Sequence, residues 1–273
     1  MLTPTDSTSP DNLKNVPNHS VPDTSYGRRF FAGQRDQSLA SARALVPLII
    51  DLLHPGSVLD VGCGLGTWLS IFQEQGVNDV IGVDGGYVDH AALCISPDLF
   101  LAHDLVAPLD LKRNFDLVLS LEVAEHLPEP SAETFIDSLV RHGDVVLFSA
   151  AIPGQIGTNH INEQWPSYWA TKFSERSFEL LDVIRPTVWR ESGIALCYKQ
   201  NVLLFIRSSS LAHGELCQSL QAPNSILDIV HPDHYLHVQT LTAMIGRILS
   251  VHPKLYGLAE RALIASRRMK RQP

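Results

Sequence analysis

The segment from Val58 to Thr67 restricts the fold of this chain more than any other part of the sequence. It reads Val-Leu-Asp-Val-Gly-Cys-Gly-Leu-Gly-Thr, so an apolar strand runs directly into three closely spaced glycines. Glycine is needed where the backbone turns sharply or lies close to a ligand. A helical stretch over 66–75 follows, and the N–H groups at a helix start can bind a negative group. A strand, a glycine turn and a helix in this order indicate an α/β protein with a ligand bound at the turn.

The spacing of the glycines separates two kinds of cofactor. A dinucleotide site prefers Gly-x-Gly-x-x-Gly, in which the third glycine allows close packing of the helix on the strand. That pattern would need glycine at Thr67, whereas this chain has Gly-x-Gly-x-Gly. Asp60 precedes the turn, and its carboxylate suits the cationic amino group of a methionine moiety better than it suits a pyrophosphate. The turn therefore favours a methionine-linked adenosine over a dinucleotide.

Three later segments add polar groups at predicted strand ends. Asp84 ends the second strand about 20 residues beyond the turn, where a carboxylate can accept hydrogen bonds from both ribose hydroxyls. Asp104 ends the third strand and can accept a bond from an adenine amino group, with Leu105 packed on the ring. The fourth strand ends in Ser120-Leu121 and continues as Glu-Val-Ala-Glu-His-Leu-Pro over residues 122–128.

Together these segments resemble the successive motifs of class I S-adenosylmethionine-dependent methyltransferases. The Glu-His-Leu-Pro segment after the fourth strand is most similar to the branch that acts on small molecules, and the resemblance covers roughly residues 35–207. It implies a Rossmann-like, doubly wound, seven-stranded sheet that is mostly parallel with an antiparallel last strand. It also implies S-adenosyl-L-methionine as cofactor, with binding residues given by motif position: Asp60, Gly62, Cys63, Gly64, Asp84, Gly85, Asp104, Leu105, Ser120 and Leu121.

Alternation of short apolar runs with helical stretches agrees with a parallel sheet covered by helices on both faces. We expect strands at 57–61, 79–83, 99–103, 115–120, 145–150, about 178–184 and 201–206. We expect helices at 38–53, 66–75, 87–94, 129–142 and 166–176. Pro47 should kink or restart the first helix. The predicted domains are a disordered tail over 1–24, the methyltransferase domain over 25–210 and a helical extension over 211–273.

Histidines supply the candidate catalytic groups. An alcohol acceptor must lose its proton, and a positioned base with a pKa near neutrality speeds this step. His126 follows the fourth strand and His160 follows the fifth, so both fall in loops that should border the cofactor. Glu163 is a weaker candidate, and its expected role is to orient an acceptor or a histidine. Glu122, Glu125, His126, His160 and Glu163 can be assembled into a metal site on paper, but no spacing demands one, and we predict none.

Histidines also cluster farther along, around Pro232. For His231, His234 and His237 we prefer a polar helix start to a zinc site, because their spacing matches no zinc pattern.

The composition of the chain limits the kinds of partner that it is expected to bind. The formal net charge of −8 argues against nucleic acid, since phosphate binding requires a basic face. No stretch has the length of a membrane span, and the N-terminus lacks the features of a secretory signal, so a cytoplasmic location is expected. The four cysteines should be reduced thiols.

We therefore predict an enzyme that methylates a hydroxyl or amino group of a small polar metabolite, such as a sugar-containing or specialised one. The alternatives are a nicotinamide-dependent oxidoreductase and a non-catalytic binding protein with the same fold.

Overall fold

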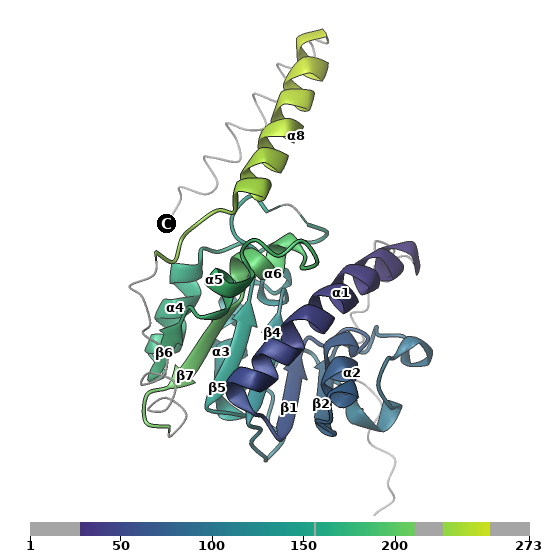
Figure 1. Cartoon of the computed structure of the whole chain (residues 1–273), viewed down its shortest axis with the longest axis vertical. Coiled ribbons are helices and arrows are strands. Elements are labelled where there is room, and N and C mark those ends of the chain that lie inside the picture. Colours follow the sequence, from purple (N-terminus) through teal and green to yellow (C-terminus); the bar gives the residue numbers. More distant parts are fainter. Residues whose placement is uncertain (1–27, 156, 211–225, 252–273) are drawn as a thin grey trace, which may run out of the picture.

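A computed structural model describes residues 28–155, 157–210 and 226–251 of the chain (Figure 1). The predicted tail over 1–24 lies outside these residues, as do 211–225 and 252–273 of the predicted extension. The predicted division into three parts therefore stays a prediction. Among the described residues, no helix combines the length and apolar character needed to span a membrane.

The described residues are built around one seven-stranded sheet with the order β3-β2-β1-β4-β5-β7-β6. All seven predicted strands are present, with ends shifted by a few residues. The strands are β1 (Ser57–Val61), β2 (Asp79–Asp84), β3 (Phe100–Ala102), β4 (Leu117–Leu121), β5 (Val145–Ser149), β6 (Phe178–Leu181) and β7 (Leu203–Arg207).

The direction of the strands agrees with the predicted fold. β1 pairs in parallel with β2 and β4, β2 with β3, and β4 with β5, whereas β7 lies antiparallel to both β5 and β6. Every residue of β1, β4 and β5 is buried, as expected for central parallel strands that are covered on both faces. The predicted doubly wound α/β fold with an antiparallel last strand is confirmed.

Two helical layers cover the sheet. The apolar side chains of α1 (Arg28–Leu53), α2 (Thr67–Glu74), α5 (Ile184–Val188) and α6 (Leu196–Asn201) form one core with one face of the strands. The side chains of α3 (Ala132–Arg141) and α4 (Pro166–Ser174) form a second core with the other face. Alternate residues of β1 show this division, because Val58 belongs to the first core and Leu59 to the second.

The structure tests two helix predictions. Helix α1 continues through Pro47 without the restart that was one of the two predicted outcomes, and the kink stays a prediction. Leu45, Val46 and Ile49 are fully buried beside Pro47, and their packing offsets the hydrogen bond that proline removes. The predicted helix over 87–94 is only the 3₁₀ turn η1 (His90–Ala92). This segment buries too few side chains to hold a longer helix on the sheet.

The remaining elements are short, apart from one helix. They are η2 (Pro97–Leu99), η3 (Ala124–His126), η4 (Glu129–Ser131) and the helix α8 (Pro232–Val251), which projects away from the sheet in Figure 1. The start of α8 is anchored to the body by Arg185, which donates to the backbone carbonyl of Leu227 at 3.0 Å. Asp228 accepts bonds from the backbone N–H and the hydroxyl of Ser167.

Candidate active site

The carboxyl ends of β1, β2 and β4 bring three predicted polar side chains to one edge of the sheet. In the register of the strands, Asp60 lies beside Gly82 of β2 and Leu119 of β4. Asp84 ends β2, and Ser120 follows Leu119 directly. Since the carboxyl ends of parallel strands meet at one edge, these groups border a common site, as in other open α/β sheets.

The glycine turn has the left-handed backbone that its sequence suggests. Gly62, Gly64 and Gly66 have φ values of 90°, 54° and 74°. A Cβ at Gly62 would lie only 2.3 Å from a methyl carbon of Val123, so this position is fixed by packing. A Cβ at Gly64 would meet no atom within 4 Å. Gly64 therefore exposes its backbone to open space, where a ligand can approach closely.

Asp84 is held by the backbone around it. Its Oδ2 accepts a bond of 2.7 Å from the N–H of Gly64, and its Oδ1 accepts one of 2.6 Å from the N–H of Gly85. The hydroxyl of Tyr87 also donates to Oδ1 at 2.6 Å. The Tyr87 side chain is 73% exposed, so it can leave this position without disturbing the core.

Asp60 is a buried carboxyl group, only 2% exposed. Burial raises its pKa to about 8, and repulsion from Asp84 contributes to the same shift. Among the residues that the structure describes, no lysine or arginine forms an ion pair with it. Buried carboxylates need a compensating charge. The ammonium group of a methionine moiety would supply one, so the residues present fit the predicted cofactor.

The other predicted cofactor residues differ in their surroundings. Cys63, Leu105 and Leu121 are buried in the cores, and burial raises the pKa of the Cys63 thiol well above its usual range. Asp104 is exposed, and its Oδ1 accepts from the N–H of Val106. The hydroxyl of Ser120 is buried and has no hydrogen-bond partner within the described residues. The roles of these five residues in cofactor binding stay predictions.

The three predicted catalytic residues lie together beside this edge. The rings of His126 and His160 are 4.9 Å apart between centroids and nearly perpendicular. Nδ1 of His160 lies 3.0 Å from Oε1 of Glu163. The backbone explains the meeting, because the carbonyl of Glu125 accepts bonds from the N–H groups of Ile161 and Asn162 and so holds the loop after β5 against η3.

The orientation of each imidazole follows from its Nδ1 contact. Nδ1 of His126 lies 3.3 Å from the carbonyl oxygen of Asn159. A carbonyl oxygen cannot donate, so Nδ1 of His126 carries the proton, and Nε2 of the neutral ring keeps its lone pair. The carboxylate of Glu163 fixes His160 in the same way. Burial lowers the pKa of His126, and the neighbouring His160 adds to this effect.

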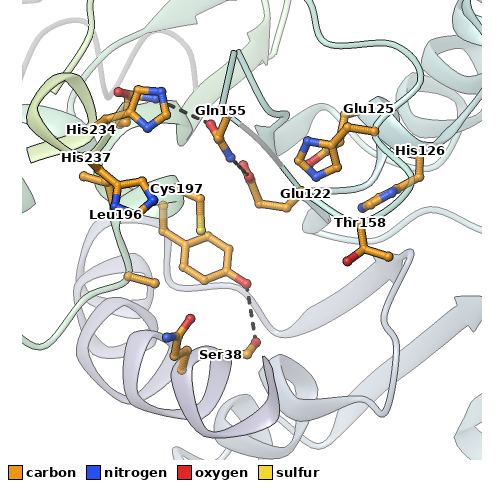
Figure 2. Close-up of a pocket in the computed structure, with 16 residues that line it drawn as sticks. Ser38, Glu122, Glu125, His126, Gln155, Thr158, Leu196, Cys197, His234 and His237 are labelled. Atoms are coloured by element: carbon orange, nitrogen blue, oxygen red, sulfur yellow. Dashed lines mark hydrogen bonds between the residues drawn. The ribbon is translucent and has the colours of Figure 1, made fainter. Parts of the chain in front are cut away.

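A cavity of about 520 Å³ opens at these histidines (Figure 2). Its floor is polar, with His126, His160, Glu122 and Gln155 pointing into it. Its opposite wall comes from α1, α6 and α8, and it includes Ser38, Leu196, Cys197, Tyr198, His234 and His237.

The sequence of the chain matches that of a known protein family. The model of a family described as "Methyltransferase domain" matches residues 31–180, more than half of the chain. The chain belongs to this methyltransferase family. The family uses S-adenosylmethionine, so the predictions of a methyltransferase and of this cofactor are confirmed, and the nicotinamide-dependent alternative is set aside.

Curated relatives of this methyltransferase are similar over a limited stretch. The tRNA U34 carboxymethyltransferase of Pseudomonas syringae pv. tomato is 35% identical over 108 residues, which cover 36% of this chain and 34% of that protein. The protein of the same name from Pseudomonas savastanoi pv. phaseolicola is 34% identical over the same length. The chain thus spans about a third of the length of the curated relatives it matches.

Two solved structures of methyltransferases are similar to this chain at low sequence identity, and the first of them reaches a TM-score that supports a shared fold. The sugar N-methyltransferase KedS8 from Streptoalloteichus has a TM-score of 0.50 and 16% identity, covering 76% of this chain and 98% of that one. DesVI from Streptomyces venezuelae has a TM-score of 0.48 and 14% identity, covering 65% and 95%.

Glu122 was named from the sequence only as a conceivable metal ligand, and its hydrogen-bond partners in the methyltransferase site were not predicted. Glu122 has the left-handed φ of 56° and carries a buried carboxyl group whose pKa is raised by that burial. Its two oxygens accept bonds from Asn201 at 3.0 Å and Gln155 at 2.7 Å. Gln200 donates to Asn201 and accepts from the N–H of His231. The one available signal was a pair of amides, Gln200 and Asn201, directly before an apolar strand.

Of the histidines clustered near Pro232, His231 serves the start of α8. His231 is buried, and its Nε2 donates to the carbonyl of Trp189 at 2.8 Å. Its Nδ1 accepts from the N–H of Asp233 at 3.1 Å, which satisfies a free donor of the first turn. His231 is therefore a structural residue, whereas His234 and His237 reach the cavity.

Proposed function

We propose that the chain transfers the methyl group of S-adenosylmethionine to a hydroxyl or amino group of a small polar molecule. The observation that carries this proposal is the cavity that opens at His126 and His160, in the segments that follow β4 and β5 at the edge of the sheet where Asp60 and Asp84 also lie. An acceptor in this cavity would lie beside the cofactor site, and holding the two reactants in line is the main requirement for methyl transfer.

The bound cofactor supplies an electrophilic methyl carbon. An acceptor's lone pair would form the new bond to that carbon, and the sulfur would leave with the electron pair of the carbon–sulfur bond. Asp60 and Asp84 are the residues that we expect to hold the cofactor for this transfer. The proton of the acceptor must leave in the same overall reaction. His160 is the proposed residue for this proton, since Glu163 orients its ring and it lines the cavity. His126 stands beside it as the second candidate.

The cavity and the charge of the chain both favour a small polar acceptor. A volume of about 520 Å³ is typical of small-molecule sites. The amides and imidazoles that line it can bind hydroxyl groups, as on a sugar-containing metabolite. The net charge of −8 repels a polyanion. The described cysteines Cys63, Cys94 and Cys197 are free thiols, which supports the predicted cytoplasmic location.

The names of the curated relatives favour a second candidate, a tRNA acceptor. The similarity that supports it covers only about a third of those proteins. Under this alternative a nucleotide base would have to reach the same cavity, while the rest of the tRNA would need a basic surface.

The test is a methyl-transfer assay with the full chain and cofactor labelled on the methyl group. Panels of hydroxylated metabolites, amino sugars and total tRNA are offered separately, and S-adenosylhomocysteine is measured. We expect transfer to a small acceptor and none to tRNA. Transfer to tRNA alone would overturn the small-molecule proposal. With the acceptor found, His160→Gln should lower turnover about 100-fold or more while cofactor affinity is unchanged. The exposed His54→Gln is the matched control.

A further inference from the structure

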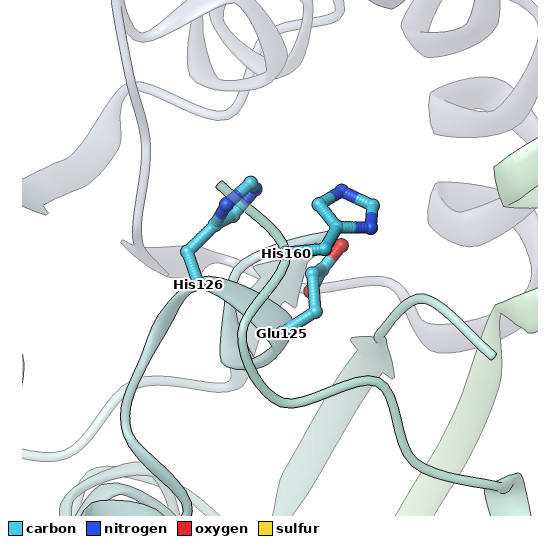
Figure 3. A group of neighbouring side chains, drawn as sticks. All are labelled: Glu125, His126 and His160. Atoms are coloured by element: carbon cyan, nitrogen blue, oxygen red, sulfur yellow. The ribbon is translucent and has the colours of Figure 1, made fainter. Parts of the chain in front are cut away.

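Three side chains at the cavity floor lie close enough to share one ion. One ligand atom from each of Glu125, His126 and His160 can be chosen so that all three lie within 4.8 Å of one another. Figure 3 shows the side chains converging from two segments, the turn after β4 and the loop after β5. From the sequence these residues could be assembled into a metal site only on paper, and none was predicted because no spacing demanded one.

The surroundings of the Glu125 side chain point to a ligand. Its side chain is 0% exposed, and no side chain among the described residues hydrogen-bonds either carboxylate oxygen, so only the backbone N–H groups of Glu125 itself and of Ala151 favour its charged form. Buried polar groups are almost always paired, and buried charges are paired or bind metals. The residues that line the cavity include no lysine or arginine within the described part of the chain. A cation would give this carboxylate the partner that it lacks.

The hydrogen-bond contacts of Nδ1 in the two imidazoles match those of histidines that bind metals. Histidine ligands almost always donate their other ring N–H to a carboxylate or a backbone carbonyl, which fixes the tautomer and the ring orientation. His160 contacts Glu163 through Nδ1, and His126 contacts the carbonyl of Asn159 through Nδ1. Both rings therefore keep Nε2 for a common ion.

We propose that Glu125, His126 and His160 bind one divalent transition-metal ion of the zinc type. Imidazole donors favour zinc and its neighbours over magnesium or calcium, and two histidines with one glutamate are a ligand set of catalytic zinc sites. Three protein ligands leave a coordination position open toward the cavity, where an acceptor oxygen can bind and become more acidic. The role in catalysis rests on the proposed function, while binding of the ion does not.

This site changes the role of the histidines. With an ion bound, Nε2 of His160 would be a ligand and would take no proton. The ion would make the acceptor more acidic, and the acceptor's proton would then pass to water in the open cavity. Glu163 then becomes a positioning residue that orients His160.

The test uses the full chain after treatment with EDTA and dialysis. The protein is titrated with Zn²⁺, measured by calorimetry, and separately with Co²⁺, measured by visible absorption. Neither cofactor nor acceptor is present. We expect one ion per chain. Glu125→Gln, His126→Gln and His160→Gln should each weaken binding at least tenfold, and Glu163→Gln should weaken it about 10- to 100-fold. His234→Gln, which lines the same cavity outside the cluster, should leave it unchanged. Thermal melting checks that each variant folds.

These experiments distinguish failure of the metal-site proposal from failure of the proposed methyl transfer. The absence of saturable binding, or binding that the His126→Gln/His160→Gln double variant retains in full, would overturn the metal site. Methyl transfer at the full rate by the EDTA-treated protein would exclude a catalytic role for the ion and would leave the proposed function intact. Specific binding of one ion without transfer to any acceptor would support the metal site and count against the proposed function.

Discussion

The hydroxyl of Tyr87 donates a hydrogen bond of 2.6 Å to Oδ1 of Asp84, on the carboxylate that we expect to receive the ribose. The two N–H groups that also bind Asp84 belong to the backbone and stay in place. Of these donors, Tyr87 is the one side chain, and it is 73% exposed. If the ribose binds Asp84 as predicted, we expect a ribose hydroxyl to replace the tyrosine hydroxyl.

Substitution of Tyr87 by phenylalanine should tighten cofactor binding several-fold. The variant keeps the ring and removes the hydroxyl that competes for Asp84, so no hydrogen bond to a charged group has to be broken first. Calorimetric titration with S-adenosylhomocysteine measures the change. Weaker binding by the variant would show that the hydroxyl contacts the bound cofactor instead.

Substitution of Asp84 by asparagine should weaken cofactor binding by more than about 1 kcal/mol, the scale of a hydrogen bond to a charged group. Asparagine keeps one oxygen for the N–H groups of the turn and removes the charge that favours the ribose hydroxyls. The same titration is used, with the exposed Asp98→Asn as the matched control. Unchanged affinity in Asp84→Asn would refute the ribose assignment.

Cofactor binding should release a proton at neutral pH. In the free protein the pKa of Asp60 is about 8, so this carboxyl group carries its proton at pH 7. A cationic ammonium beside it favours the carboxylate form. Affinity should therefore rise as the pH increases from 6 toward 8. At pH 7 the binding enthalpy should depend on the ionisation enthalpy of the buffer.

The control for this prediction is Asp60→Asn, whose side chain cannot titrate. We expect the buffer dependence to disappear in this variant, together with part of the affinity. Equal proton release by both proteins would assign the proton to another group and would remove Asp60 from the contact with the cofactor.

Two alanine substitutions in the glycine turn should separate folding from binding. Gly62→Ala places a Cβ against Val123 at a φ of 90°, so we expect a clear loss of stability in thermal unfolding. Gly64→Ala meets no atom and costs only about 1–2 kcal/mol for its left-handed backbone. Its main effect should be weaker cofactor binding, because the new methyl group enters the ligand's space. A stable Gly62→Ala protein with normal binding would contradict this division.

Local sequence patterns were sufficient for most of the fold. The strands of the centre are fully buried apolar runs, and the glycine turn with Asp60 identified the cofactor, because all of these features lie within a few adjacent residues. The short helices α5 and α6 were missed because neither is long enough to show an amphipathic repeat. Continuity of α1 through Pro47 depends on packing against the sheet, which no local pattern reveals.

The candidate catalytic residues could be named from the sequence, but their arrangement could not. His126 and His160 meet because the carbonyl of Glu125 binds two N–H groups of a loop more than thirty residues away. That no described side chain hydrogen-bonds the buried Glu125 carboxyl group is likewise a property of the folded interior. The partners of Glu122 lie farther still, on the loop after β5 and on α6, so only the tertiary structure brings them together.

The hydrogen bonds of Glu122 have a consequence for acceptor choice. Both oxygens of its carboxyl group are held by amides, and Asn201 and Gln200 tie these amides to the start of α8 at His231. A shift of Glu122 would leave several buried polar groups unsatisfied at once, which is costly. This wall of the cavity is thus preformed and stiff. If acceptors bind here as proposed, we expect them to be selected by their fit to a fixed shape.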